Sequence, residues 1–141
     1  MAKRNAPMRV LVPVDRSGPS EAALEEALEQ FPEAEIHVLH VLQVKTPWGE
    51  DTKAGGKISV DEGKEILDSA KSIAADHGRD LETEMVEGNA AKTIVSYAEE
   101  NDIDRIVMGS VGRSGVSRLL LGSVAEAVTR RAPCSVTIVR E

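Results

Sequence analysis

Five short runs along the chain are rich in apolar residues of the kind that favour β-strands. The runs are Met8–Asp15, Ala34–Leu42, Leu81–Gly88, Asp104–Ser110 and Cys134–Arg140. Strands that are apolar along nearly their whole length are typical of a sheet that is covered on both faces. The third run is more polar than the others, which indicates a half-exposed strand or a strand at the edge of the sheet.

Between these runs, apolar residues recur at the spacing of amphipathic helices. The predicted helices are Pro19–Phe31, Asp61–His77, Ala90–Asn101 and Val124–Arg131. Asn89 is placed to cap the third helix, and Ser123 with Glu126 has the S-x-x-E spacing of a capping box at the fourth. Ser59 with Glu62 has the same spacing before the second helix.

The regular alternation of strands and helices predicts an α/β fold: a doubly wound, five-stranded, mostly parallel sheet with helices on both faces. A chain of 141 residues fits one domain, which we place at residues 1–141. Residues 45–59 are polar and glycine-rich and include Pro47, so we expect a flexible loop there. That loop serves either as a plain linker or as a flap over a ligand.

Composition and charge narrow the function classes. The chain has a formal net charge of −7, which disfavours nucleic-acid binding. Cys134 is the single cysteine, which excludes an internal disulfide and favours an inert core thiol. No apolar run approaches membrane-spanning length, so we expect a cytoplasmic protein without membrane contact. Residues 105–141 hold six arginines against two acidic residues, which indicates a small anionic ligand or a solvated charge pattern without a binding role.

The stretch 107–128 contains Gly109, Gly112 and Gly122 between a predicted strand and a predicted helix. Glycine permits positive φ angles and a close approach of another group to the backbone. In open α/β sheets, ligands bind beyond the carboxyl ends of the strands, where the strand order reverses. The glycines therefore indicate either a ligand-binding loop or an ordinary strand–loop–helix connection.

The start of the fourth helix favours an anionic ligand. The backbone N–H groups of Ser123, Val124 and Ala125 belong to a first helical turn, where such groups have no partner within the helix. The helix dipole adds positive potential at the same place. Arg113 or Arg118 is placed to add charge-assisted contacts to a phosphate.

The glycine pattern lacks the lysine of a Walker A loop and the spacing of the dinucleotide-binding motif G-x-G-x-x-G. It is G-x2-G-x9-G-S, and it resembles the motif of the universal stress protein family, in the branch that binds ATP. The resemblance extends over nearly the whole chain. It includes the segments VLVPVDRS, VLHVL, DRIVMGSVGRSG and APCSVTIVR.

The resemblance implies which residues hold the nucleotide. Pro13, Val14 and Asp15 are expected to belong to the nucleotide site. Asp15 is expected to face adenine and ribose, although it also suits a turn before the first helix. Val41 is expected to contact adenine through its backbone, and Met108 either packs near the ribose or belongs to the core. The phosphates are expected to lie among Gly109, Gly112, Arg113, Gly122, Ser123 and Val124.

Arg16 departs from the family, which often has glycine at this position, and the departure bears on the geometry of the turn. The resemblance implies ATP as the ligand, with ADP and AMP as alternatives and Mg²⁺ accompanying the triphosphate. It also implies the strand order 3-2-1-4-5 and a homodimer through the last strand, around Val136 and Ile138.

Three function classes follow. The first is an ATP-binding regulatory protein of the stress response that acts through nucleotide-dependent conformation or assembly. The second is an enzyme of the same fold with slow ATP hydrolysis or adenylation chemistry, for which the sequence offers no convincing catalytic residue. The third is a nucleotide-free interaction module. His37 and His40, three apart on one strand, are expected on opposite faces and not as a metal pair.

Overall fold

The computed structural model describes residues 6–43, 53–111 and 121–140, with residues 53–59 described as backbone only. Its described strands form one parallel sheet in the order β3-β2-β1-β4-β5. The bounds are β1 Arg9–Pro13, β2 Glu35–Leu42, β3 Glu82–Glu87, β4 Arg105–Gly109 and β5 Ser135–Val139. The predicted parallel sheet, its strand order and the edge position of the third strand are confirmed.

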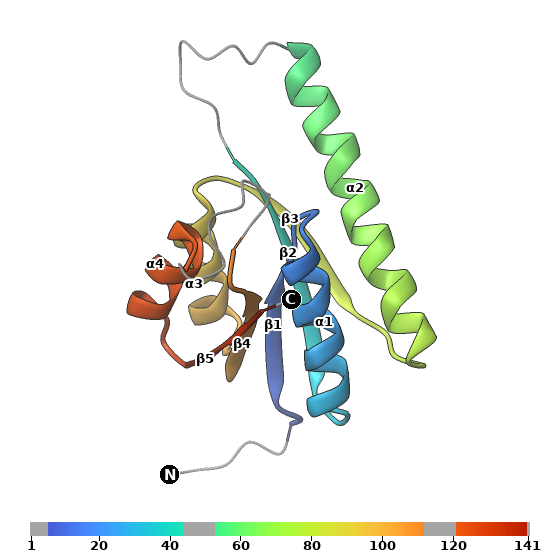
Figure 1. The fold of residues 1–141 in the computed structure, drawn as a ribbon, viewed down its shortest axis with the longest axis vertical. Helices are drawn as coiled ribbons and strands as arrows, with labels where there is room; N and C mark the ends of the chain where they lie inside the picture. Colours follow the sequence, from blue (N-terminus) through green and yellow to red (C-terminus); the bar gives the residue numbers. More distant parts are fainter. Residues whose placement is uncertain (1–5, 44–52, 112–120, 141) are drawn as a thin grey trace.

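The described helices form two layers, one on each face of the sheet (Figure 1). Their bounds are α1 Gly18–Gln30, α2 Lys53–Asp76, α3 Ala90–Glu100 and α4 Ser123–Arg131. Helices α1 and α2 pack on one face, and α3 and α4 pack on the other. None of the helices in the described part of the chain is long and apolar enough to cross a membrane.

Helix α2 begins at Lys53, eight residues before the predicted start at Asp61. The prediction of a loop is therefore wrong for residues 53–59, and residues 44–52 lie outside the described residues. Ser59 and Glu62 lie inside the helix and do not mark its beginning. Each helical glycine costs only about 1 kcal/mol relative to alanine, so Gly55 and Gly56 do not stop a helix that is already nucleated.

Strand residues alternate between the two cores, as the period of a β-strand requires. Val10, Val12 and Val38 pack under α1 and α2. Leu11 and Leu39 pack under α3 and α4. All five are fully buried, so the central strands are covered on both faces, and the interpretation of their continuous apolar runs is confirmed.

The two strand histidines lie on opposite faces of the sheet, as expected. His37 is hydrogen-bonded through Nδ1 to the hydroxyl of Tyr97 on α3, at 2.8 Å. His40 is hydrogen-bonded through Nδ1 to the carbonyl of Val14, at 2.9 Å, and its ring lies close to Gly63 of α2. Burial raises the pKa of Tyr97 to about 12, which keeps its hydroxyl protonated in this contact.

Candidate functional site

The order of the strands reverses at β1, which lies between β2 and β4. The chain runs outward from β1 through β2 to β3, and then crosses back to β4 on the other side of β1. A crevice at the carboxyl ends of β1 and β4 is the usual ligand site of such sheets. The residues that follow β1 and β4 therefore line the candidate site.

Asp15 and Val41 reach the same edge of the sheet from neighbouring strands. Pro13, the last residue of β1, pairs with Leu39 of β2. Asp15 lies two residues beyond Pro13, in the turn that follows β1, and Val41 lies two residues beyond Leu39. Val41 is half-buried at the carboxyl end of β2, where it pairs with Val86 of β3. The backbone of Val41 therefore lies at the carboxyl end of the sheet, where the adenine contact is expected.

Asp15 organises the turn between β1 and α1. Its Oδ1 accepts hydrogen bonds from the backbone N–H of Ser17, at 2.9 Å, and from the Ser17 hydroxyl, at 2.5 Å. Ser17 is the N-cap of α1 and accepts a hydrogen bond from the backbone N–H of Ser20. The Ser20 hydroxyl in turn accepts from the backbone N–H of Asp15, at 3.0 Å. The structure therefore shows the predicted turn role of Asp15.

Gly109 is explained by packing against α1. A Cβ atom at this position would lie 2.8 Å from both the carbonyl carbon and the Cβ of Pro19, closer than real Cβ contacts come. Pro19 is in the first turn of α1, so a side chain at Gly109 would push the helix away from β4. A close approach to the backbone at Gly109 is therefore present, and the group that approaches is Pro19 of the same chain.

Positive φ angles are not the reason for the described glycines of the motif. Among the described glycines, only Gly78 and Gly88 have positive φ. Gly122 has φ −64° and ψ 157°, a conformation that any residue adopts. Gly109 and Gly122 therefore do not use the positive φ angles that glycine permits. Gly112 lies outside the described residues, as do Arg113 and Arg118.

Helix α4 begins without a side-chain cap. Its N-cap is Gly122, whose carbonyl accepts the N–H of Glu126 at 2.9 Å and whose N–H is bound by the carbonyl of Ser110 at 2.8 Å. The prediction of Ser123 as the cap is wrong, because Ser123 is the first residue of the helix itself. The predicted capping box does not form, and Glu126 pairs with Arg130 one turn later, at 3.1 Å.

Helices α1 and α3, in contrast, carry side-chain caps. The side chain of Ser17 caps α1, and that of Asn89 caps α3 as predicted. At α4, no described residue accepts a hydrogen bond from the N–H groups of Ser123, Val124 or Ala125. These are the donors that the sequence predicted to face a phosphate.

Met108 and Cys134 belong to the core under α3 and α4. Met108 is 5% exposed and packs in the buried cluster of that face, as in the core alternative for this residue. Cys134 is half-buried against the same cluster, and burial raises the pKa of its thiol, which keeps the sulfur in its unreactive protonated form.

Comparison with known proteins decides the family. The model of the universal stress protein family matches residues 7–140. The chain belongs to the universal stress protein family. This universal stress protein is 35% identical over 139 residues to universal stress protein MJ0531 of Methanocaldococcus jannaschii, with 94% of this chain and 82% of the relative covered.

Solved structures agree with this assignment. The universal stress protein UspA of Lactobacillus plantarum has a TM-score of 0.81 and 28% identity, with 96% of this chain and 100% of that chain covered. A universal stress protein solved in complex with cAMP has a TM-score of 0.73 and 26% identity, with 96% and 98% covered. The universal stress protein of Archaeoglobus fulgidus in complex with dAMP has a TM-score of 0.69 and 28% identity, with 94% and 97% covered.

Arg16 of this universal stress protein joins the β1–α1 turn to α2. Its guanidinium contacts the carboxylates of Glu62 and Glu65, both at 3.0 Å. Hydrogen bonding to Glu65 raises the pKa of Arg16. Arg16 and Glu65 line a cavity of about 170 Å³ between α1 and α2, and Asp15 and Ser20 line it as well. The sequence pattern drew attention to Arg16 but did not predict its partners, because Glu62 and Glu65 lie on α2, far along the chain.

Proposed function

We propose that this universal stress protein binds an adenine nucleotide, with ATP as the preferred ligand. The observation that carries the proposal is the start of α4, where Gly122 leaves the N–H groups of Ser123, Val124 and Ala125 without an acceptor among the described residues. Free first-turn N–H groups and the helix dipole together favour a phosphate. The relatives solved with cAMP and dAMP support an adenine nucleotide as the class of ligand.

The roles of the site residues follow from this placement. The phosphates occupy the start of α4, with Gly112 and Arg113 completing the loop around the outer phosphates and Mg²⁺ accompanying the triphosphate. At the other end of the site, Asp15 binds the ribose. One of its oxygens is engaged by Ser17, and no described residue donates to the second oxygen. The backbone of Val41 recognises adenine.

We further propose that nucleotide binding is read out as a change of conformation or assembly in a stress response. Helix α4 follows β4 in the order of the elements, and β5 follows α4 directly along the chain. A ligand at the start of α4 therefore acts on the element that precedes the edge strand β5. This coupling supports a regulatory role, with a homodimer through β5 as the assembled form.

The substitution Gly122→Asp tests the phosphate site. The φ and ψ angles of Gly122 suit aspartate, which is a slightly better N-cap than glycine. We expect unchanged or slightly raised thermal stability, because the carboxylate caps the free N–H groups. Its negative charge occupies the place of the phosphate, so we expect calorimetry to show at least about tenfold weaker ATP binding, equivalent to about 1.4 kcal/mol.

Gly122→Asn is the matched control, because it supplies a cap of the same shape without a charge. It should weaken ATP binding less than Gly122→Asp does. If the folded Gly122→Asp protein binds ATP with the affinity of the unmodified protein, the phosphate does not lie at the start of α4 and the proposal fails.

A further inference from the structure

The end of α2 is fastened to the end of α1 by one side chain. Arg79, just after α2, donates hydrogen bonds to the carbonyls of Leu28, at 2.9 Å, Phe31, at 3.1 Å, and Ala34, at 2.9 Å. These carbonyls belong to the last turn of α1 and the segment that follows it. The contact fixes the position of His77, two residues before Arg79, relative to α1.

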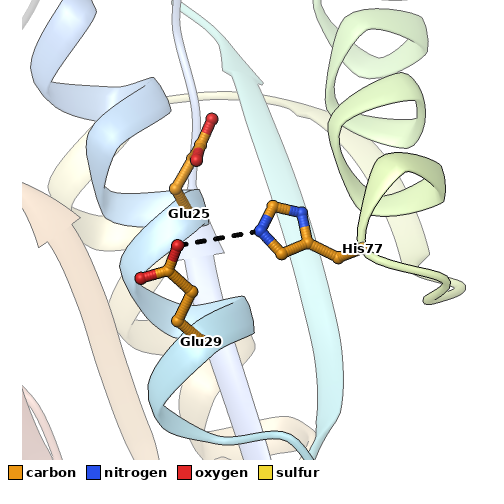
Figure 2. A group of neighbouring side chains, drawn as sticks. All are labelled: Glu25, Glu29 and His77. Atoms are coloured by element: carbon orange, nitrogen blue, oxygen red, sulfur yellow. Dashed lines mark ion pairs between the residues drawn. The ribbon is translucent and has the colours of Figure 1, made fainter.

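His77 faces two glutamates of α1 that lie one helical turn apart, Glu25 and Glu29 (Figure 2). One ligand atom from each of the three side chains lies within 4.8 Å of the others. Nε2 of His77 and Oε2 of Glu29 are 3.9 Å apart, which is too long for a hydrogen bond. Within the described part of the chain, no cationic side chain pairs with Glu25, so the repulsion between the two carboxylates is not offset there.

The imidazole of His77 is oriented by its other nitrogen. Nδ1 lies 3.0 Å from the carbonyl oxygen of Ile73, which can only accept a hydrogen bond, so Nδ1 is the donor. In the neutral ring, the lone pair of Nε2 is then directed toward the glutamates. A backbone carbonyl that binds the second ring nitrogen is the usual support of a histidine that ligates a metal.

We propose that Glu25, Glu29 and His77 bind a divalent transition metal ion of the zinc type between α1 and α2. One imidazole nitrogen and two carboxylates are suitable ligands for Zn²⁺, and water completes the tetrahedron. Ligand atoms about 2.1 Å from a tetrahedral metal are about 3.4 Å apart. A small rotation of the exposed Glu29 side chain would shorten the 3.9 Å distance between its Oε2 and Nε2 of His77 to this value.

The proposed metal site is separate from the nucleotide site. Two of the three side chains come from the second half of α1 and the third, His77, directly follows α2, whereas the proposed nucleotide site lies at the starts of α1 and α4. A metal there would join α1 to α2 on one face of the sheet. Its effect is therefore a stabilisation of that helix pair and does not depend on ATP.

The site can be tested by titrating the untagged full chain with ZnCl₂ in a calorimeter and by thermal melting with and without Zn²⁺. We expect one site per chain and a rise of the melting midpoint by about 5–10 °C when Zn²⁺ exceeds its dissociation constant about a hundredfold. Because loss of an outer-shell partner alone costs a metal site 10–100-fold, His77→Gln and Glu29→Gln should each weaken binding by at least about tenfold.

Two variants serve as controls. Glu26→Gln removes an adjacent α1 carboxylate that is bonded to Gln30 and lies outside the proposed site. Cys134→Ser removes the single thiol, a strong zinc ligand that lies outside the proposed site. Both should keep the affinity and the thermal shift. Loss of binding in Cys134→Ser, equal binding in His77→Gln and the unmodified protein, or absence of any binding would each overturn the proposal.

Discussion

At the scale of single residues, Asp15 combines a structural task with a proposed binding task. One carboxylate oxygen holds Ser17, the residue that caps α1. The second oxygen has no donor among the described residues and lies at the edge of the sheet where the nucleotide is proposed to bind. A short, acidic side chain suits both tasks, because it can turn back to its own backbone and still present one oxygen outward.

The two tasks of Asp15 can be separated by substitution. Asp15→Ala should weaken adenine-nucleotide binding by roughly five- to a hundredfold, because a hydrogen bond left unmade in a closed site costs about 1–3 kcal/mol. Calorimetry with ATP measures this loss. Ser17→Ala is the matched control, because it removes the cap and costs about 1 kcal/mol of stability without touching the ligand. Equal nucleotide affinities of Asp15→Ala and the unmodified protein would remove Asp15 from the site.

At the scale of elements, two glycines of the motif have different structural roles: Gly109 at the end of β4 and Gly122 at the start of α4. Gly109 allows β4 to approach Pro19 of α1, whereas Gly122 leaves the first turn of α4 without a side-chain cap. One sequence motif therefore serves helix packing at one end and, under the proposed function, ligand binding at the other. The two contributions predict different outcomes when each glycine is replaced.

Gly109→Ala should destabilise the fold while leaving the binding chemistry of the folded protein in place. The new Cβ meets the backbone of Pro19 and not a flexible side-chain end, so the helix or the strand must shift. Overpacking of this kind costs about 1–3 kcal/mol, which urea denaturation measures. If the variant instead keeps its full stability and loses ATP affinity, Gly109 is a ligand contact and the packing explanation is wrong.

At the scale of the whole molecule, β3 and β5 form the two edges of the sheet. The carbonyl of Val139 accepts a hydrogen bond from Ser110 after β4, at 2.9 Å. Backbone groups alternate in direction along a strand, so those of Val136 and Ile138 face the open edge. Their side chains are half-buried, which leaves apolar surface beside unpaired N–H and carbonyl groups. An edge with these properties suits pairing with a second copy.

Ile138→Pro should convert the proposed homodimer into a folded monomer. Proline removes the N–H that faces the open edge and leaves the pairing of β5 with β4 intact, as is typical of proline on edge strands. Sedimentation velocity at micromolar concentration measures the change. Thr137→Pro is the contrasting variant, because it removes an N–H directed toward β4 and should lower stability. A dimer that persists in Ile138→Pro excludes assembly through β5.

The sequence by itself determined the elements and their order. Apolar runs and helical periodicity are local properties, and β1, β2 and α3 follow them closely, with Asn89 as the predicted cap. Alternation of strands and helices was enough to indicate parallel pairing, because right-handed crossovers leave few other arrangements. The family resemblance added the strand order and the candidate ligand.

The tertiary structure decided what depends on contacts between distant segments. Gly122, not Ser123, caps α4, because the carbonyl of Ser110 fixes the N–H of Gly122 just before the helix. The reason for Gly109 is Pro19, on another element. His77 meets Glu29 only because both α1 and α2 pack on one face of the sheet. Periodicity specifies which face of an element is buried, but the partner it meets there is set by the crossovers of the sheet.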